Sequence, residues 1–204
     1  MNILVIGSGG REHAVIKAIK NNPAVETIYC LPGNGGIAAD ATCVNIGAKD
    51  IDGIVKFASE NAIDYAVVTP DDPLVLGCVD ALTAIGIPCF GPDKRAAIIE
   101  GSKAFSKDLM KKYGIPTAAY EIFDDMDKAI AYLQDKDMPI VIKADGLALG
   151  KGVIIAQNLA EAEEAVRSMM VDKVFGASGD HVVIEECNKR GIAMAFTGMR
   201  LFHH

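Results

Sequence analysis

Residues 2–12, NILVIGSGGRE, decide the first half of the fold. Asn2–Gly7 is a continuous apolar run that ends in glycine, which is typical of a buried strand in a parallel sheet. Arg11–Lys20 follows with apolar residues at helical spacing, and Asn21-Asn22-Pro23 ends that pattern. A strand, a glycine-rich turn and a helix in this order predict the start of an α/β domain.

Strand and helix patterns alternate through the first hundred residues. Further strands are predicted at Thr27–Leu31, Asp64–Thr69 and Pro88–Gly91, and further helices at Ile51–Glu60 and Pro73–Ile85. This alternation predicts a parallel sheet with helices on both faces. Ligands of such sheets bind beyond the carboxyl ends of the strands, so we expect a site in the loops that follow them.

The pattern changes after Gly91-Pro92, where residues 93–100 and 102–112 predict two helices in succession. The later strands are predicted at Ala119–Phe123, Pro139–Ala144, Val153–Ala156 and His181–Glu186, with helices at Asp125–Asp135 and Leu159–Val171. The strands PIVIKA and VIIA, joined by a glycine-rich loop, predict an antiparallel hairpin. We therefore predict an N-terminal α/β domain over residues 1–101, an α+β segment over 102–186 and an atypical tail over 187–204.

Composition narrows the possible functions. The 204 residues are 50% hydrophobic, which is enough to bury a core, and no apolar stretch reaches the roughly 18 residues of a membrane span. We expect neither a signal peptide nor a membrane segment. The net charge of −7 argues against nucleic acid as a partner, because binding the phosphate backbone needs a basic surface. Five scattered cysteines without a C-x-x-C pair predict free thiols in a reducing cytoplasm.

The glycine-rich turn Gly7–Glu12 has the features of a phosphate-binding loop, because its glycines admit a ligand and a helix N-terminus favours an anion. It departs from the dinucleotide fingerprint, since Glu12 stands where glycine or alanine is needed and the second strand ends without an acidic residue. Together with the loops Pro32–Gly36 and Thr69–Pro73, it predicts a pocket for a small phosphorylated molecule. A plain tight turn is the alternative for each loop.

The segment Lys143–Gly152 places one lysine at a strand end and a second within a loop that contains three glycines. Such a loop can fold over phosphates, with backbone N–H groups and lysine supplying positive charge. It is not a P-loop, because Gly follows Lys151 and a strand comes next. A long hairpin turn is the alternative. Glu185-Glu186 ends an apolar strand, where a nucleotide partner and a solvated strand end are equally consistent with the pattern.

Seven segments together resemble the phosphoribosylamine–glycine ligase family, the ATP-grasp carboxylate–amine ligases of purine synthesis. The resemblance covers about residues 1–186, in order. The segments are VIGSGGREHA (Val5–Ala14), LPGNGG (Leu31–Gly36), TPDDPLVLG (Thr69–Gly77), FGP (Phe90–Pro92), EGSKAFSKDLM (Glu100–Met110), IVIKADGLALGKGV (Ile140–Val153) and VIEE (Val183–Glu186).

The resemblance implies a fold, a reaction and a set of binding residues. The fold is a parallel-sheet domain followed by an incomplete α+β ATP-grasp domain. In such ligases ATP phosphorylates the glycine carboxylate, and the nitrogen of 5-phosphoribosylamine attacks the acyl phosphate, releasing ADP and phosphate. The implied ATP-binding residues are Lys103, Lys143, Gly146, Gly150, Lys151, Gly152, Glu185, Glu186 and the backbone of Cys187. The implied phosphoribosylamine-binding residues are Gly9, Gly10, Arg11, Asn34 and Asp72; no catalytic residue is assigned.

The tail departs from the family pattern, because no Asp or Glu occurs after Glu186. The family's Mg²⁺ or Mn²⁺ ligands are therefore expected to be absent from this chain. We expect a truncated ligase with impaired turnover, which a second chain carrying the C-terminal half could complement. The tail is predicted to pack on the exposed sheet edge through Ile192, Met194, Phe196 and Leu201. Two alternatives stay open: another ATP-grasp carboxylate–amine ligase, and a non-catalytic remnant that binds a nucleotide or a phosphosugar.

Overall fold

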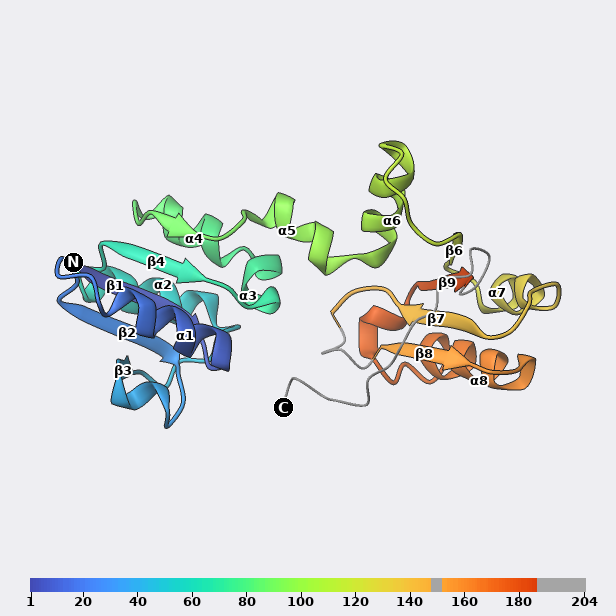
Figure 1. The fold of residues 1–204 in the computed structure, drawn as a ribbon, viewed down its shortest axis with the longest axis horizontal. Coiled ribbons are helices and arrows are strands. Elements are labelled where there is room, and N and C mark those ends of the chain that lie inside the picture. The colour runs from blue at the N-terminus through green and yellow to red at the C-terminus, as the bar shows by residue number, and fades with distance from the viewer. Residues whose placement is uncertain (148–151, 187–204) are drawn as a thin grey trace. The chain divides into compact units, whose positions relative to one another are not determined.

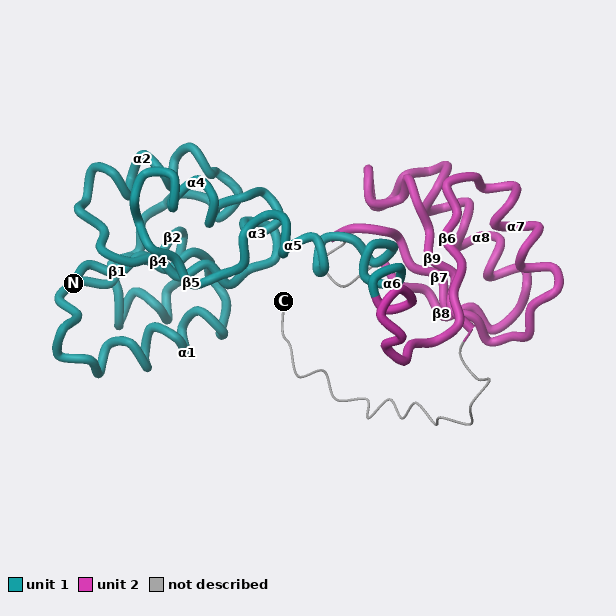
Figure 2. Tube along the Cα trace, turned by 90° about the horizontal axis from the view of Figure 1, so that it is seen from above, with its two compact units in different colours: residues 1–109 teal, residues 110–204 magenta. Residues whose placement is uncertain are grey.

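The computed structural model describes residues 1–147 and 152–186. The chain divides into two compact units, Met1–Leu109 and Met110–His204, drawn in teal and magenta in Figure 2. The positions of the two units relative to one another are not determined. Within the described ranges, no helix is both long enough and apolar enough to cross a membrane.

The first unit is built on a five-stranded parallel sheet, with the strand order β3-β2-β1-β4-β5 (Figure 1). Its strands are β1 (Asn2–Gly7), β2 (Thr27–Pro32), β3 (Thr42–Cys43), β4 (Tyr65–Val68) and β5 (Cys89–Phe90). Its helices are α1 (Gly10–Ile19), η1 (Ile37–Ala39), α2 (Ile51–Glu60), α3 (Asp71–Leu76), α4 (Cys78–Ala84) and α5 (Lys94–Gly101), followed by α6 (Lys103–Lys112), which crosses into the second unit. The predicted parallel sheet is confirmed.

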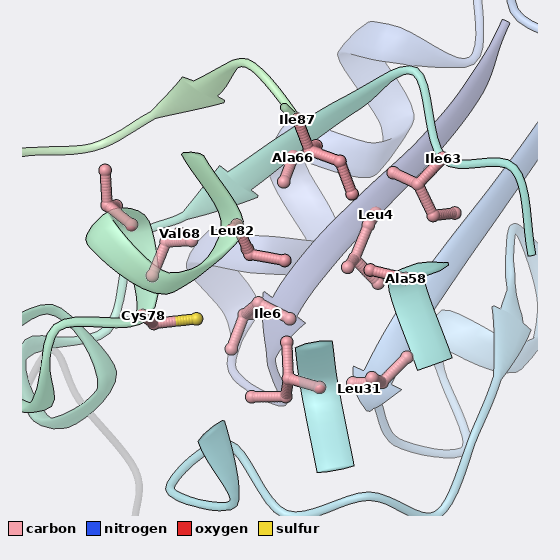
Figure 3. Packing of buried hydrophobic residues seen from close by; sticks show 12 residues of the cluster. Leu4, Ile6, Leu31, Ala58, Ile63, Ala66, Val68, Cys78, Leu82 and Ile87 are labelled. Atoms are coloured by element: carbon pink, nitrogen blue, oxygen red, sulfur yellow. The ribbon is translucent and has the colours of Figure 1, made fainter. Parts of the chain in front are cut away.

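Helices cover both faces of this sheet, as the sequence predicts. On one face Leu4 and Ile6 of β1 pack with buried residues of α2 and α4, and Figure 3 shows these side chains pointing toward one another. On the other face Ile3 and Val5 of β1 pack against Ile16 of α1. Because successive side chains of a strand point to opposite faces, one uninterrupted apolar strand supplies both clusters.

The single helix predicted over Pro73–Ile85 is wrong: two helices, α3 and α4, meet at Gly77. Gly77 has φ +91°, a left-handed conformation that glycine adopts at little cost and that ends α3. The apolar spacing continues on both sides of this residue, so periodicity alone could not reveal the break.

The second unit contains a four-stranded antiparallel sheet with the order β6-β9-β7-β8. Its strands are β6 (Tyr120–Phe123), β7 (Ile140–Ala144), β8 (Val153–Ala156) and β9 (Val182–Glu186). Its helices are α7 (Met126–Leu133), α8 (Leu159–Met170) and η2 (Gly176–Gly179). The predicted antiparallel hairpin is confirmed as the pair β7 and β8, and β9 lies between β6 and β7.

One face of this sheet forms the core of the second unit. Ile140 and Ile142 of β7 and Ile184 of β9 are fully buried there, against buried residues of α7 and α8. Alternation along β7 and β9 therefore sends Lys143 and Glu185 to the opposite face. Glu186, the next residue along β9, lies on the face of Ile184 instead.

Candidate functional site

Two loops meet at the carboxyl edge of the parallel sheet. The N–H of Gly33, after β2, donates to the carbonyl of Gly7 at the end of β1 over 3.1 Å. The side-chain amide of Asn34 donates to the carbonyl of Ser8 over 2.7 Å, and its oxygen accepts from the N–H groups of Gly36 and Ile37. Asn34 therefore ties the two glycine-rich loops together.

Glu12 connects the first of these loops to the loop after β4. Its carboxylate accepts hydrogen bonds from the N–H of Gly9 (2.7 Å), the hydroxyl of Thr69 (2.6 Å) and Nε of Arg11 (3.2 Å). Burial opposes ionisation of this residue, which is only 3% exposed, but the hydrogen bonds outweigh burial and hold the pKa of Glu12 below its ordinary value. The ionised carboxylate accepts hydrogen bonds and donates none.

The close approach of Glu12 explains why the first loop begins with glycine. A Cβ on Gly7 would lie 2.7 Å from Cγ of Glu12 and 2.9 Å from Cγ of Pro70, distances that real Cβ atoms do not tolerate. Gly7 also has φ +129°, which side-chain-bearing residues rarely adopt. Here glycine is required by packing against a carboxylate.

An open pocket of about 660 Å³ lies beside this loop, at the carboxyl ends of β4 and β5. Arg11 and Thr69 supply its polar groups, and the exposed ring of Phe90 lies at its wall. The remaining lining residues are Val68, Leu74, Cys89, Gly91 and Pro92. A cation and a hydroxyl in a partly apolar pocket suit a small polar molecule that carries a negative charge.

The structure connects three of the five predicted phosphoribosylamine-binding residues through this network. Gly9 and Arg11 both donate to Glu12. Asn34 donates to the carbonyl of Ser8, in the loop that joins β1 to α1. Gly10 begins α1, and a Cβ placed there would meet nothing within 4 Å. Asp72, in the first turn of α3, forms an ion pair with Lys49 over 2.7 Å.

Two ion pairs lie on opposite faces of the antiparallel sheet, at the C-terminal part of β9. Nζ of Lys143 donates to Glu185 over 2.8 Å, and their side chains are 25% and 10% exposed. The neighbouring Glu186 accepts from Nζ of Lys136 over 3.0 Å, and that ammonium also lies 4.1 Å from the centre of the Tyr132 ring. Hydrogen bonds to Glu186 and Tyr132 raise the pKa of Lys136.

The glycine-rich loop begins beside Lys143. The N–H of Ala144 donates to the carbonyl of Gly152 over 2.8 Å, and Gly146 has φ +93°. Three predicted ATP-binding residues, Gly150, Lys151 and Cys187, lie outside the described residues, as does the predicted packing of the tail. Lys103 begins α6 in the first unit, so the structure fixes no distance between it and Lys143.

The sequence predicts the loops that contain Glu12 and Thr69 as part of the site but assigns neither residue a role, and it does not indicate Phe90 as part of the pocket. Thr69 is 57 residues from Glu12, and their contact depends on β1 and β4 being neighbours. A signal for Glu12 was available, because a carboxylate three residues after a helix N-cap is the spacing of a capping box. Among residues 1–147 and 152–186, no group of three or more His, Cys, Asp or Glu residues could hold a metal ion.

Two family models match consecutive parts of the chain. The model of the phosphoribosylglycinamide synthetase N domain matches residues 1–100. The model of the ATP-grasp (A) domain of the same synthetase matches residues 101–200, which extends beyond Glu186.

Individual relatives agree with these models. A phosphoribosylamine–glycine ligase of Vibrio vulnificus is 54% identical over 188 residues, which is 91% of this chain and 44% of that protein. The crystal structure of the Thermotoga maritima phosphoribosylamine–glycine ligase has a TM-score of 0.74 at 29% identity, covering 92% of this chain and 44% of that one.

A more distant structure shares the fold. The biotin carboxylase domain of the Hydrogenobacter thermophilus 2-oxoglutarate carboxylase, solved with MgADP and bicarbonate, has a TM-score of 0.74 at 20% identity, over 92% of this chain and 44% of that one. The chain thus spans less than half the length of the relatives it matches. The consecutive family matches and the named relatives show that it belongs to the phosphoribosylglycinamide synthetase family, the phosphoribosylamine–glycine ligases.

Proposed function

We propose that this chain supplies the phosphosugar-binding surface and part of the ATP-binding surface of a phosphoribosylamine–glycine ligase. The observation that carries the proposal is the match of two successive domains of one synthetase, in order, over residues 1–200. We take residues 1–101 as the phosphosugar-binding domain and residues 102–186 as part of the ATP-grasp domain. The reaction would join glycine to 5-phosphoribosylamine at the expense of ATP, in the cytoplasm.

The phosphosugar would bind at the carboxyl edge of the parallel sheet. Arg11 is the cation of the pocket there, and its side chain is 60% exposed. Its guanidinium can donate to phosphate oxygens. Gly9 and Gly10 lie beside it at the N-terminus of α1, where the Gly9 N–H already donates to Glu12. Asn34 would hold the two glycine-rich loops together, and Asp72 would contribute from the first turn of α3.

ATP would bind on the face of the antiparallel sheet that carries Lys143. The ammonium of Lys143 is held by Glu185 and still partly exposed, which suits it to contact the phosphate oxygens of a nucleotide. The resemblance to the family adds further phosphate-binding residues to this proposal: Lys103, Gly146, Gly150, Lys151 and Gly152. It assigns adenine to Glu186 and the backbone of Cys187, although the Glu186 side chain pairs with Lys136 on the opposite face of the sheet.

A second candidate function is binding of ATP and the phosphosugar without turnover. It is favoured by the lack, among the described residues, of a cluster that could hold a metal ion. Phosphoryl transfer from ATP ordinarily uses Mg²⁺ to neutralise the phosphates, and the described residues do not fit such a site. We therefore assign no step of the reaction to a metal held by this part of the chain.

Calorimetric titration of ATP tests the nucleotide site. We expect saturable binding by the chain, and a loss of affinity of at least about tenfold in Lys143→Met, because charge-assisted hydrogen bonds to phosphate contribute about 1.5–3 kcal/mol each. Lys173→Met is the matched control, because it removes a lysine of the same unit whose partner, Asp180, is exposed. This variant should bind ATP like the unmodified chain. Equal affinity of all three proteins would refute the assignment of Lys143.

An assay of ADP release in the presence of glycine and freshly generated phosphoribosylamine separates the two candidate functions. Release that requires both substrates would establish the ligase reaction for this chain. Binding of ATP without such release would establish the binding function instead. Ribose 5-phosphate is a stable analogue of the phosphosugar. A chain that binds neither ATP nor ribose 5-phosphate would refute both candidate functions.

A further inference from the structure

A single buried carboxylate joins three parts of the pocket wall. Glu12 accepts from the Gly9 N–H in the glycine-rich loop, from Nε of Arg11 on α1 and from the hydroxyl of Thr69 after β4. The Glu12 side chain is 4% exposed, whereas that of Arg11 is 60% exposed. Glu12 therefore lies behind the residues that a ligand would touch.

The hydrogen-bond polarity of the pocket follows from this arrangement. A hydroxyl has one proton to donate, and the Thr69 proton is given to the carboxylate. Towards the pocket, which Thr69 lines, its oxygen can act only as an acceptor. Arg11 has donors only, and its bond through Nε fixes the plane of the guanidinium at the same wall.

We propose that Glu12 is a positioning residue that makes Thr69 an acceptor for a hydroxyl or amine of the phosphosugar and aligns Arg11 as a donor to its phosphate. This inference rests on the proposed function, and it adds the polarity of the site. The pocket would select a ligand that presents a hydrogen-bond donor and an anion on the same side. An isosteric amide at residue 12 keeps one acceptor oxygen, whereas the three donors are shared between two: Arg11 and Thr69 donate to Oε1 and Gly9 donates to Oε2. In either orientation the amide places its NH₂ group against at least one of these donors, so only the carboxylate accepts from all three.

Calorimetric titration with ribose 5-phosphate tests the proposal. We expect about tenfold weaker binding by Glu12→Gln and by Thr69→Val, since each loses a hydrogen bond that involves a charged group. Thr69→Ser keeps the hydroxyl and should recover most of the affinity that Thr69→Val loses. Glu60→Gln, which removes an exposed carboxylate at the end of α2, is the matched control.

Two results would overturn the inference. One is a Glu12→Gln chain that binds as tightly as Glu60→Gln; the other is a Thr69→Ser chain that binds as weakly as Thr69→Val. If Glu12→Gln fails to fold, the comparison of the two Thr69 variants still decides, because neither variant alters the carboxylate.

A measurement without ligand separates this inference from the proposed function. If the unmodified chain does not bind ribose 5-phosphate, the phosphosugar site is refuted. The positioning role is then read from amide hydrogen exchange of Gly9, whose N–H donates to Glu12. We expect exchange about tenfold faster in Glu12→Gln than in Glu60→Gln. Equal exchange rates would show that Glu12 does not hold the loop.

Discussion

The ion pair between Lys143 and Glu185 allows a sharp test of whether burial or distance decides the strength of a charge pair. The two side chains are 25% and 10% exposed, and their N–O distance is 2.8 Å. In the same unit, Lys173 and Asp180 are closer, at 2.6 Å, but 43% and 57% exposed. Water screens an exposed pair, so the longer contact should be the stronger one.

The magnitude follows from these exposures. Exposed pairs couple by about 0.2–1 kcal/mol, and removing one partner of a fully buried pair costs about 3–5 kcal/mol. Lys143→Met and Glu185→Gln should therefore each destabilise the second unit by about 2 kcal/mol, and the double variant should lose about 1–2 kcal/mol less than their sum. The corresponding cycle with Lys173→Met and Asp180→Asn should show coupling within the error of measurement.

Amide hydrogen exchange in denaturant is the appropriate assay, because the chain has no Trp and contains two units. The slowest amides of β7 and β9 report the free energy of unfolding of the second unit alone. If the coupling between Lys143 and Glu185 does not exceed that between Lys173 and Asp180, the argument from burial is refuted.

Further predictions concern backbone, core and pH. Gly77→Ala should cost about 1–2 kcal/mol in chemical denaturation because its φ is +91°, whereas Gly47→Ala, where a Cβ meets nothing within 4 Å, should cost little. Ile142→Ala should lower the free energy of unfolding of the second unit by about 3 kcal/mol, and Val153→Ala, at a 43% exposed position, by less than about 0.5 kcal/mol. Hydrogen bonds hold the pKa of Glu12 in the folded chain below its ordinary value of 4.5, despite burial. The ionised carboxylate therefore stabilises the fold fully above pH 4.5, and this contribution is lost as the pH falls through the pKa of the folded state. Glu12→Gln should make the free energy of unfolding depend less on pH in this range.

Much of the fold follows from local pattern. The apolar strand Asn2–Gly7 predicts burial on both faces, and the spacing of strands and helices predicts a parallel sheet. Thr42–Cys43 escapes prediction because two residues carry no periodicity, and β3 exists only through its register with Tyr29 and Cys30. The insertion of β9 between β6 and β7 is equally invisible, since strand order depends on pairing between distant segments.

The candidate site is predicted only in part, for the same reason. Local glycine patterns indicate the loops at Gly9 and Asn34, and a lysine at a strand end singles out Lys143. The roles of Glu12 and Thr69 depend on a contact across 57 residues. In the sequence, Glu12 stands out only as a departure from the dinucleotide-binding pattern. In the structure, its carboxylate joins Gly9, Arg11 and Thr69.

The edges of the two sheets have a practical consequence for handling the protein. The parallel sheet ends in β3 and β5, strands of two residues each, which leave little backbone for another chain to pair with. Within the described residues, the antiparallel sheet ends in the four-residue strand β8, where Val153 and Ile155 are both exposed. An apolar edge of this kind is a template for intermolecular strand pairing. A lysine at either position would be the first change to make for higher solubility at the concentrations that NMR and crystallisation require.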